Sequence, residues 1–163
     1  MTTTPPVRRI RDISALLDHA SHVLATRMAA AFTELGITPR AYCVLFHAQE
    51  AERTQIQLAE LADLDKTTMV VTVDELEKAG LAERRPSATD RRARIISVTE
   101  EGARAVVKGT EIADRVHREL LESLPQPEQD AFVSALSRLV DGHLAEPVES
   151  DRTVRRARRS RGQ

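Results

Sequence analysis

The chain has 163 residues, of which 41% are hydrophobic and 30% are charged. This length and composition suit one folded domain and exclude a chain that is disordered throughout. The formal net charge is -1, so only local charge clusters can point to a partner. Aromatic residues make up 2%, which argues against RNA-binding modules that stack bases on aromatic rings. The single cysteine excludes an intramolecular disulfide framework and an all-cysteine zinc site.

The start of the chain has basic residues with no apolar run behind them, so we expect no secretory signal. No stretch approaches the roughly 20 apolar residues of a membrane helix. We therefore expect a soluble, cytoplasmic protein that has no membrane partner and lies in a reducing compartment.

Apolar residues recur in steps of three or four over residues 10–35, which predicts a long amphipathic helix. Gly36 is suited to end this helix. Thr38 and Pro39 are typical of the N-cap and first position of a second helix, which we extend to about residue 52.

Two further helices are predicted close together in the sequence. Thr54 and Gln57 have the spacing of a capping box at the start of a short helix. Asp65 is a good N-cap for the next helix, which Gly80 should end. A helix, a short turn and a second helix in such a short span predict a helix-turn-helix motif.

Two short strands, residues 81–85 and 94–98, are predicted after this motif, with turn-forming residues between them. A long helix should then run from Thr99 to about residue 124, and a last helix should carry apolar residues from Phe132 to Leu144. The fold class is therefore mostly α with a small β-hairpin. A helix-turn-helix followed by a hairpin is the winged-helix layout, with long N- and C-terminal helices around it.

A step of 100° per residue assigns the two faces of the helix after Asp65. Met69, Thr72, Val73 and Leu76 share the face that we expect in the core. The opposite face should enter the major groove of DNA, where threonine hydroxyls and valine methyls can contact base edges. Its candidate contacts are Thr67, Thr68, Val70 and Val71, with Lys66 placed for a phosphate. The alternative is an ordinary exposed face, on which two adjacent valines would be unusual.

Positive charge concentrates in the predicted hairpin. Five arginines against one aspartate give a net charge of +4 within residues 84–94: Arg84, Arg85, Arg91, Arg92 and Arg94 against Asp90. Arginine suits the negative potential of a narrow minor groove, and Asp90 is placed to pair with Arg92 and hold the loop. The alternative is a solvated charged loop.

These segments resemble the multiple-antibiotic-resistance regulator (MarR) family. Residues 65–69 (Asp-Lys-Thr-Thr-Met) and 76–81 (Leu-Glu-Lys-Ala-Gly-Leu) are similar to its recognition helix. Residues 83–86 (Glu-Arg-Arg-Pro), 90–94 (Asp-Arg-Arg-Ala-Arg) and 98–102 (Val-Thr-Glu-Glu-Gly) are similar to its wing and the following helix. The family's wing signature, aspartate, any residue, arginine, is here Asp90 and Arg92.

The resemblance implies a homodimeric winged-helix transcription factor that binds a pseudo-palindromic operator in double-stranded DNA. It implies that Arg92, supported by Asp90, enters the minor groove, with Arg91 and Arg94 nearby. It implies one domain over residues 10–146, with a DNA-binding lobe at about 38–98 and dimerisation helices at about 10–35 and 99–146. Residues 1–9 and 147–163 should then be a flexible N-terminus and a disordered tail.

The tail holds six arginines and two acidic residues, a net charge of +4. It could add nonspecific phosphate contacts or have no role. One position departs from the family, because many members carry a polar residue and an arginine where this chain has Val70 and Val71. Fewer bonds to guanine should follow, so we hypothesise an A/T-rich operator.

Many family members, most often repressors, release DNA when a small aromatic or phenolic ligand binds between the dimer helices and the DNA-binding lobe. The resemblance makes six residues candidates for such a pocket: His19, His22, Arg40, Tyr42, Cys43 and His47. The two histidines could instead be surface or interface residues. They have no third ligand that the sequence identifies, so we expect no metal, and we expect no cofactor.

Two alternatives stay open for the function. Cys43 could sense peroxide, as one cysteine does in some relatives, because Arg40 and His47 lie three and four residues away. A winged helix could also bind another protein instead of DNA, although such a module needs no arginine-rich wing. No nucleophile elbow, phosphate-binding glycine loop or metal motif is present, so we expect no enzyme.

Overall fold

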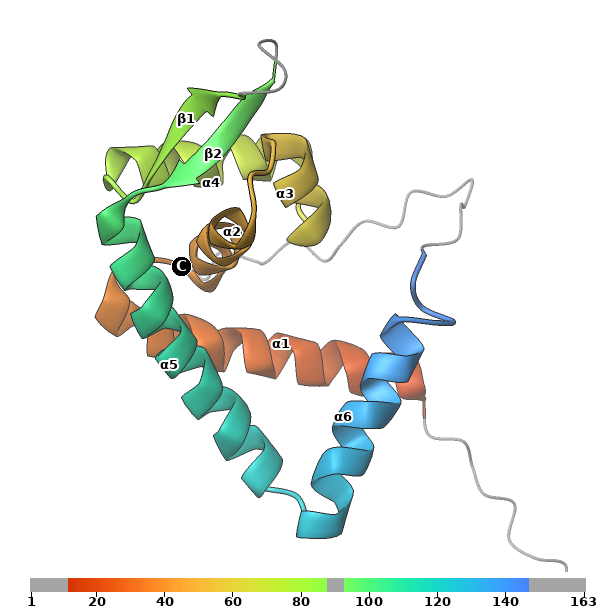
Figure 1. Cartoon of the computed structure of the whole chain (residues 1–163). Coiled ribbons are helices and arrows are strands. Elements are labelled where there is room, and N and C mark those ends of the chain that lie inside the picture. Colours follow the sequence, from red (N-terminus) through yellow and green to blue (C-terminus); the bar gives the residue numbers. More distant parts are fainter. Residues whose placement is uncertain (1–11, 88–92, 147–163) are drawn as a thin grey trace, which may run out of the picture. The chain divides into compact units, whose positions relative to one another are not determined.

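The structure is a computed structural model that describes residues 12–87 and 93–146 (Figure 1). It is mostly helical with one antiparallel hairpin, as the sequence predicts. The elements in chain order are α1 (Ile13–Ala31), the 3-10 helix η1 (Phe32–Leu35), α2 (Pro39–Glu50), α3 (Gln55–Leu61), α4 (Lys66–Lys78), β1 (Ala82–Pro86), β2 (Arg94–Val98), α5 (Glu100–Glu122) and α6 (Gln126–Val140). The chain divides into two compact units between residues 119 and 120.

The predicted helix starts are confirmed by their capping bonds. Thr38 caps α2 by accepting a hydrogen bond from the Ala41 backbone N–H at 3.1 Å. Thr54 and Gln57 form both bonds of the predicted capping box at the start of α3. These bonds occupy backbone N–H groups that have no partner within the first turn of a helix.

The first predicted helix ends earlier than its apolar pattern suggests. The α-helix stops at Ala31, and residues 32–35 form a 3-10 turn instead. The Phe32 backbone N–H is shared between the carbonyl groups of Met28 and Ala30, which tightens the last turn. Gly36 then ends the segment with a φ of +72°, a backbone conformation that favours glycine.

The core of the first unit lies among α2, α3, α4, the hairpin and α5. Its fully buried large side chains include Leu45 of α2, Leu58 of α3, and Met69 and Leu76 of α4. Ile96 of β2 joins the same cluster and is 1% exposed. Because these helices and both strands of the hairpin contribute to one apolar cluster, the helix-turn-helix and the hairpin are held against each other.

Two glycines let α5 approach this unit closely. A side chain at Gly102 would meet the Leu81 carbonyl oxygen at 2.0 Å, so the start of α5 packs directly on the start of the hairpin. A side chain at Gly109 would meet the Tyr42 ring at 2.4 Å. The Tyr42 hydroxyl and the Thr110 hydroxyl form a hydrogen bond of 3.0 Å beside it. These contacts fix α5 against α2.

The second unit contains α6, which begins at Gln126 with Pro127 inside its first turn. Proline is tolerated there because the backbone N–H of that position lacks a helical partner. The helix ends at Val140, so Leu144 lies beyond it. No residue of α6 is buried, and its apolar side chains, among them Phe132, Leu136 and Leu139, are exposed.

Among residues 12–87 and 93–146, no helix is both long and apolar enough to cross a membrane. The arginine-rich tail and the N-terminal residues predicted to be flexible lie outside the described residues.

Candidate nucleic-acid interface

The two faces of α4 lie as the periodicity predicts. Met69, Thr72, Val73 and Leu76 are the buried residues of this helix. The polar member, Thr72, donates its hydroxyl to the Thr68 carbonyl oxygen at 2.8 Å, so no polar group is left unsatisfied there. The opposite face is available to a partner.

Four of the five predicted contact residues of α4 are exposed: Lys66, Thr67, Val70 and Val71. Val71 is 51% exposed and Val70 is 37% exposed. Exposing two adjacent valine side chains to water is unfavourable in free energy, and contact with a DNA partner would remove this apolar surface from water.

The fifth predicted contact, Thr68, is already engaged within the helix. Its backbone N–H and hydroxyl both donate to the Asp65 carboxylate, at 2.9 and 2.6 Å. The hydroxyl bond and then the backbone bond lower the pKa of this carboxyl from its ordinary value. Thr68 therefore supports the helix start, and its hydroxyl proton is not free for a base.

The hairpin is a two-stranded antiparallel ribbon with Ala82 opposite Val98 and Pro86 opposite Arg94. The segment before α3 adds to its other side, because Thr54 bridges to Ile95 and the Ile96 N–H donates to the Arg53 carbonyl oxygen at 3.1 Å. The base of the wing is therefore held by the helix-turn-helix itself.

Arg84 of β1 joins the wing to the two helices of the motif. Its guanidinium forms ion pairs with Glu77 and, at 2.6 Å, with Asp74, both on α4. Its backbone N–H also donates to the Glu77 carboxylate at 2.8 Å. A longer bond of 3.4 Å reaches the Gln55 side-chain oxygen on α3. We call this set of contacts the Arg84 clamp.

Ion pairs within the protein neutralise part of the positive charge predicted for the hairpin. Arg84 is committed to two carboxylates, and Arg85 pairs with Glu83 on its own strand. Arg94, the first residue of β2, is exposed. The predicted minor-groove residues, Asp90, Arg91 and Arg92, lie outside the described residues, so their pairing stays a prediction.

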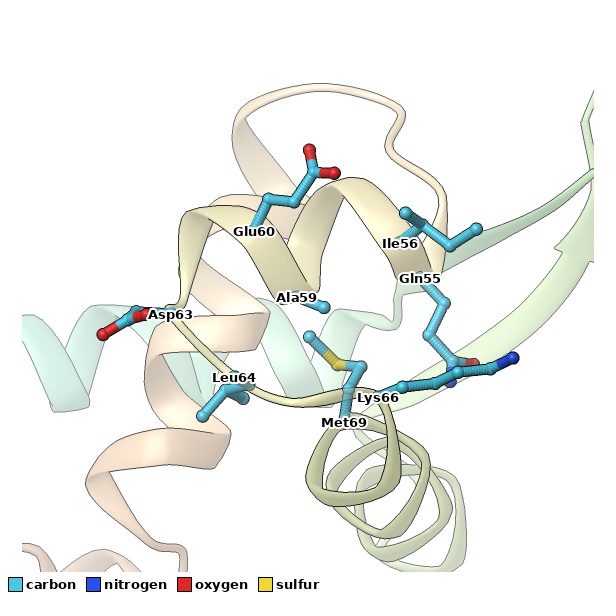
Figure 2. Close-up of a pocket in the computed structure, with 8 residues that line it drawn as sticks. All are labelled: Gln55, Ile56, Ala59, Glu60, Asp63, Leu64, Lys66 and Met69. Atoms are coloured by element: carbon cyan, nitrogen blue, oxygen red, sulfur yellow. The ribbon is translucent and has the colours of Figure 1, made fainter. Parts of the chain in front are cut away.

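Two hollows flank α4. The first, about 460 Å³, lies between α3 and α4 and has an apolar floor that includes Ala59, Leu64 and Met69. Figure 2 shows Ala59 and Met69 facing each other there, with the Glu60 and Asp63 carboxylates directed away and Lys66 beside Gln55. The second, about 280 Å³, lies between α2 and α4 and is lined mainly by threonines together with Arg40. We call it the α2-side groove.

Residues 35–93 match the family model described as the MarR family. The match covers α2, α3, α4 and β1, which are less than half of the chain, so this segment is similar to the MarR family. Among solved structures, a probable transcriptional regulator from Pseudomonas aeruginosa is 28% identical with a TM-score of 0.72, over 79% of this chain and 97% of that chain. CouR from Rhodococcus jostii RHA1, bound to p-coumaroyl-CoA, is 29% identical with a TM-score of 0.71, over 85% of this chain and 96% of that chain.

A third related structure is described as the transcriptional repressor CouR bound to a 23-mer DNA duplex. It is 25% identical with a TM-score of 0.72, over 78% of this chain and 92% of that chain. Two of these relatives are described as a probable transcriptional regulator and a transcriptional repressor, which supports a transcriptional regulator as the class of this chain.

The six residues predicted for a ligand pocket are not gathered in either of the two hollows. Arg40 lines the α2-side groove, beside the exposed face of α4. His19 and His22 are exposed on α1. His47 is half-buried, and its Nδ1 lies 3.1 Å from a Glu50 carboxylate oxygen.

Tyr42 and Cys43 lie on α2 in packed surroundings. The Tyr42 ring lies 5.2 Å from that of Phe32 and 6.0 Å from that of Phe46, centre to centre. Cys43 is half-buried, and burial raises the pKa of its thiol. A raised pKa disfavours the reactive thiolate, so the structure gives no support to the peroxide-sensing alternative.

Sequence reasoning missed the Arg84 clamp and the position of Arg40. The clamp has a signal in the sequence, since the second half of the recognition helix is acidic and a basic strand follows it. The proximity of Arg40 to α4 has no such signal, because it depends on how two separate helices pack.

Proposed function

We propose that this DNA-binding regulator is a sequence-specific repressor that binds double-stranded DNA as a homodimer and is released by a small ligand. The observation that carries the proposal is the exposed apolar and hydroxyl face of α4, formed by Thr67, Val70 and Val71. This face offers methyl groups for thymine and a hydroxyl for a base edge or phosphate.

The distribution of charge along α4 supports an approach to DNA by its first half. Lys66 and Arg40 lie beside the N-terminal half of the helix. The acidic residues Asp74, Glu75 and Glu77 lie in the second half, where Arg84 pairs with two of them. Since phosphates repel carboxylates, the N-terminal half should enter the major groove, as in other helix-turn-helix proteins.

The exposed apolar residues of α1 and α6 support the homodimer. Ile13 and Leu16 on α1, and Phe132 and Leu139 on α6, are each more than two-fifths exposed. Such side chains suit burial against a second copy of the chain. Two copies related by a two-fold axis would place their α4 helices in successive major grooves, about 34 Å apart.

Release by a small aromatic or phenolic ligand is proposed from the relative CouR, whose structure holds p-coumaroyl-CoA. The predicted candidates His19, His22, Tyr42 and His47 stay proposals for this ligand. A ligand that binds the DNA-incompetent arrangement of the dimer better would shift the population away from DNA.

The test is selection of bound duplexes from a random library at about physiological salt, with the intact protein and Arg92→Ala. The proposal predicts an enriched pseudo-palindrome that the variant binds much more weakly, because the wing contact is lost. An A/T-rich core would also support the predicted role of the two valines. Failure of the intact protein to enrich any duplex would contradict the proposal and favour a protein-binding winged helix.

The selected operator also tests repression and release. Titrating p-coumarate and p-coumaroyl-CoA into the complex should lower operator occupancy if a phenolic ligand is the signal. Transcription from a promoter that carries the operator should rise when the chain is removed. Lower transcription on removal would identify an activator instead.

A further inference from the structure

We propose that Arg40 binds a backbone phosphate of the operator on the flank of α4 that faces α2, and so sets how the recognition helix sits in the major groove. This inference rests on the proposed function. It makes Arg40 a positioning residue for DNA binding, in place of the ligand-pocket role predicted from the sequence.

The position of Arg40 is the first observation. The residue lies in the first turn of α2, is exposed, and lines the α2-side groove. The other wall of this groove is α4, from Thr67 in its first turn to Glu75 in its third. The guanidinium therefore lies along the flank of the same helix whose outer face carries Val70 and Val71.

The availability of Arg40 is the second observation. Among the described residues it has no hydrogen bond or ion pair, whereas Arg53 and Arg84 are both paired. The hydroxyls of Thr68 and Thr72 are used inside α4, and the Thr38 hydroxyl oxygen caps α2. The Arg40 guanidinium and the hydroxyls of Thr67 and Thr38 are thus the donors that the groove leaves for a ligand, and among them only Arg40 carries a charge.

The charge of the groove selects where an anion can bind. Glu75 lies on the wall two turns along α4 from Thr67 and would repel a phosphate. An anion is therefore favoured at the end that Arg40 and Thr67 share. The planar guanidinium suits a phosphate, because it can donate two parallel hydrogen bonds to it.

The dimensions of DNA bring a phosphate to this place. A helix with its side chains is about 10–12 Å wide, and the major groove is about 12 Å wide. A helix that enters this groove must therefore lie against the backbone of one strand on each flank. Lys66 borders the hollow on the α3 flank and Arg40 borders the groove on the α2 flank, so each can meet a different strand.

Such a contact has a distinct signature in binding. Phosphate contacts position a protein but carry no base preference, so the selected sequence should not change when Arg40 is replaced. The dependence of log affinity on log salt should fall by about 0.9 per lost contact, or about 1.8 for two subunits. A residue that lined only a ligand pocket would leave this slope unchanged.

The experiment compares the intact protein, Arg40→Gln and Arg40→Lys on the selected operator across a range of salt concentrations. Arg40→Gln should bind more weakly at low salt with the reduced slope, and Arg40→Lys should keep the slope because its charge remains. Arg118→Gln is the matched control, since Arg118 is an exposed arginine of α5. It should retain both affinity and slope, and thermal unfolding should show that all variants fold.

Neutral methylphosphonates placed one at a time along the operator then locate the contact. A methylphosphonate at one position in each half-site should lower the operator affinity of the intact protein. The same substitution should not lower the affinity of Arg40→Gln any further. If the intact protein selects an operator but Arg40→Gln keeps its slope and couples to no phosphate, this inference is overturned while the proposed function stands. If no operator is selected, both are overturned.

Discussion

Asp65 fixes the start of the recognition helix through its two bonds to Thr68. These bonds hold the pKa of the Asp65 carboxyl below its ordinary value, so the folded protein favours the charged form. The stabilisation is complete above the unfolded-state pKa of about 3.9 and is lost as the pH falls through the lower folded-state pKa.

Asp65→Asn should therefore change how stability depends on pH. Asparagine is also a good N-cap but carries no charge to lose. The difference in unfolding free energy between the intact protein and this variant should shrink as the pH falls below about 4. Urea unfolding at several pH values measures it, with Asp65→Ala as the control that lacks the cap at every pH. A difference that stays constant down to acid pH would contradict this account of the cap.

Cys43 has the surroundings of a structural cysteine. Burial raises the pKa of its thiol, so little thiolate is present near neutral pH. Mild peroxide should therefore leave the operator affinity of the intact protein unchanged, as a mobility-shift titration before and after treatment would show. Loss of binding that Cys43→Ser prevents would instead establish a redox sensor.

The recognition helix and the wing act as one element through the Arg84 clamp. Arg84→Met leaves Glu77 and Asp74 of α4 without the arginine that pairs with them. We expect a loss of about 1–2 kcal/mol in unfolding free energy, together with weaker minor-groove protection in a footprint. Arg85→Met removes the same charge from the same strand but should change stability by less than about 0.5 kcal/mol. Equal stability of the two variants would argue against the clamp.

The predictable parts of these elements are the local ones. Thr38, Thr54 and Asp65 cap their helices as sequence rules expect, because a cap needs only the next three residues. The buried face of α4 also follows from the sequence, because a step of 100° per residue places its apolar residues on one side of the helix. The partners of Arg84 and the neighbours of Arg40 lie on other elements, so they depend on tertiary packing that a single sequence does not reveal.

At the scale of the whole molecule, we expect the protein to act as a homodimer. Phe132, Leu136 and Leu139 share one exposed face of α6, which we propose to be buried against a second copy. Phe132→Glu should shift a dimer towards monomers in sedimentation experiments, because burial of such a side chain contributes about 1.5–3 kcal/mol. Ser134→Glu, on the opposite face of the same helix, should leave the dimer intact. A monomeric intact protein, or a dimer that Phe132→Glu does not weaken, would contradict this role of α6.

The central claim is that the exposed face of α4 reads DNA, and the affinity of Val71→Asp for the selected operator tests it most directly. A carboxylate at this position would face base edges and phosphates, so we predict a loss of about 1.4–2.8 kcal/mol in binding free energy, which is a tenfold to hundredfold loss of affinity. Val107→Asp, at an exposed valine of α5 outside the α1 and α6 faces proposed for the dimer, should bind as the intact protein does. If Val71→Asp folds and binds the operator as tightly as the intact protein, α4 does not read DNA through this face.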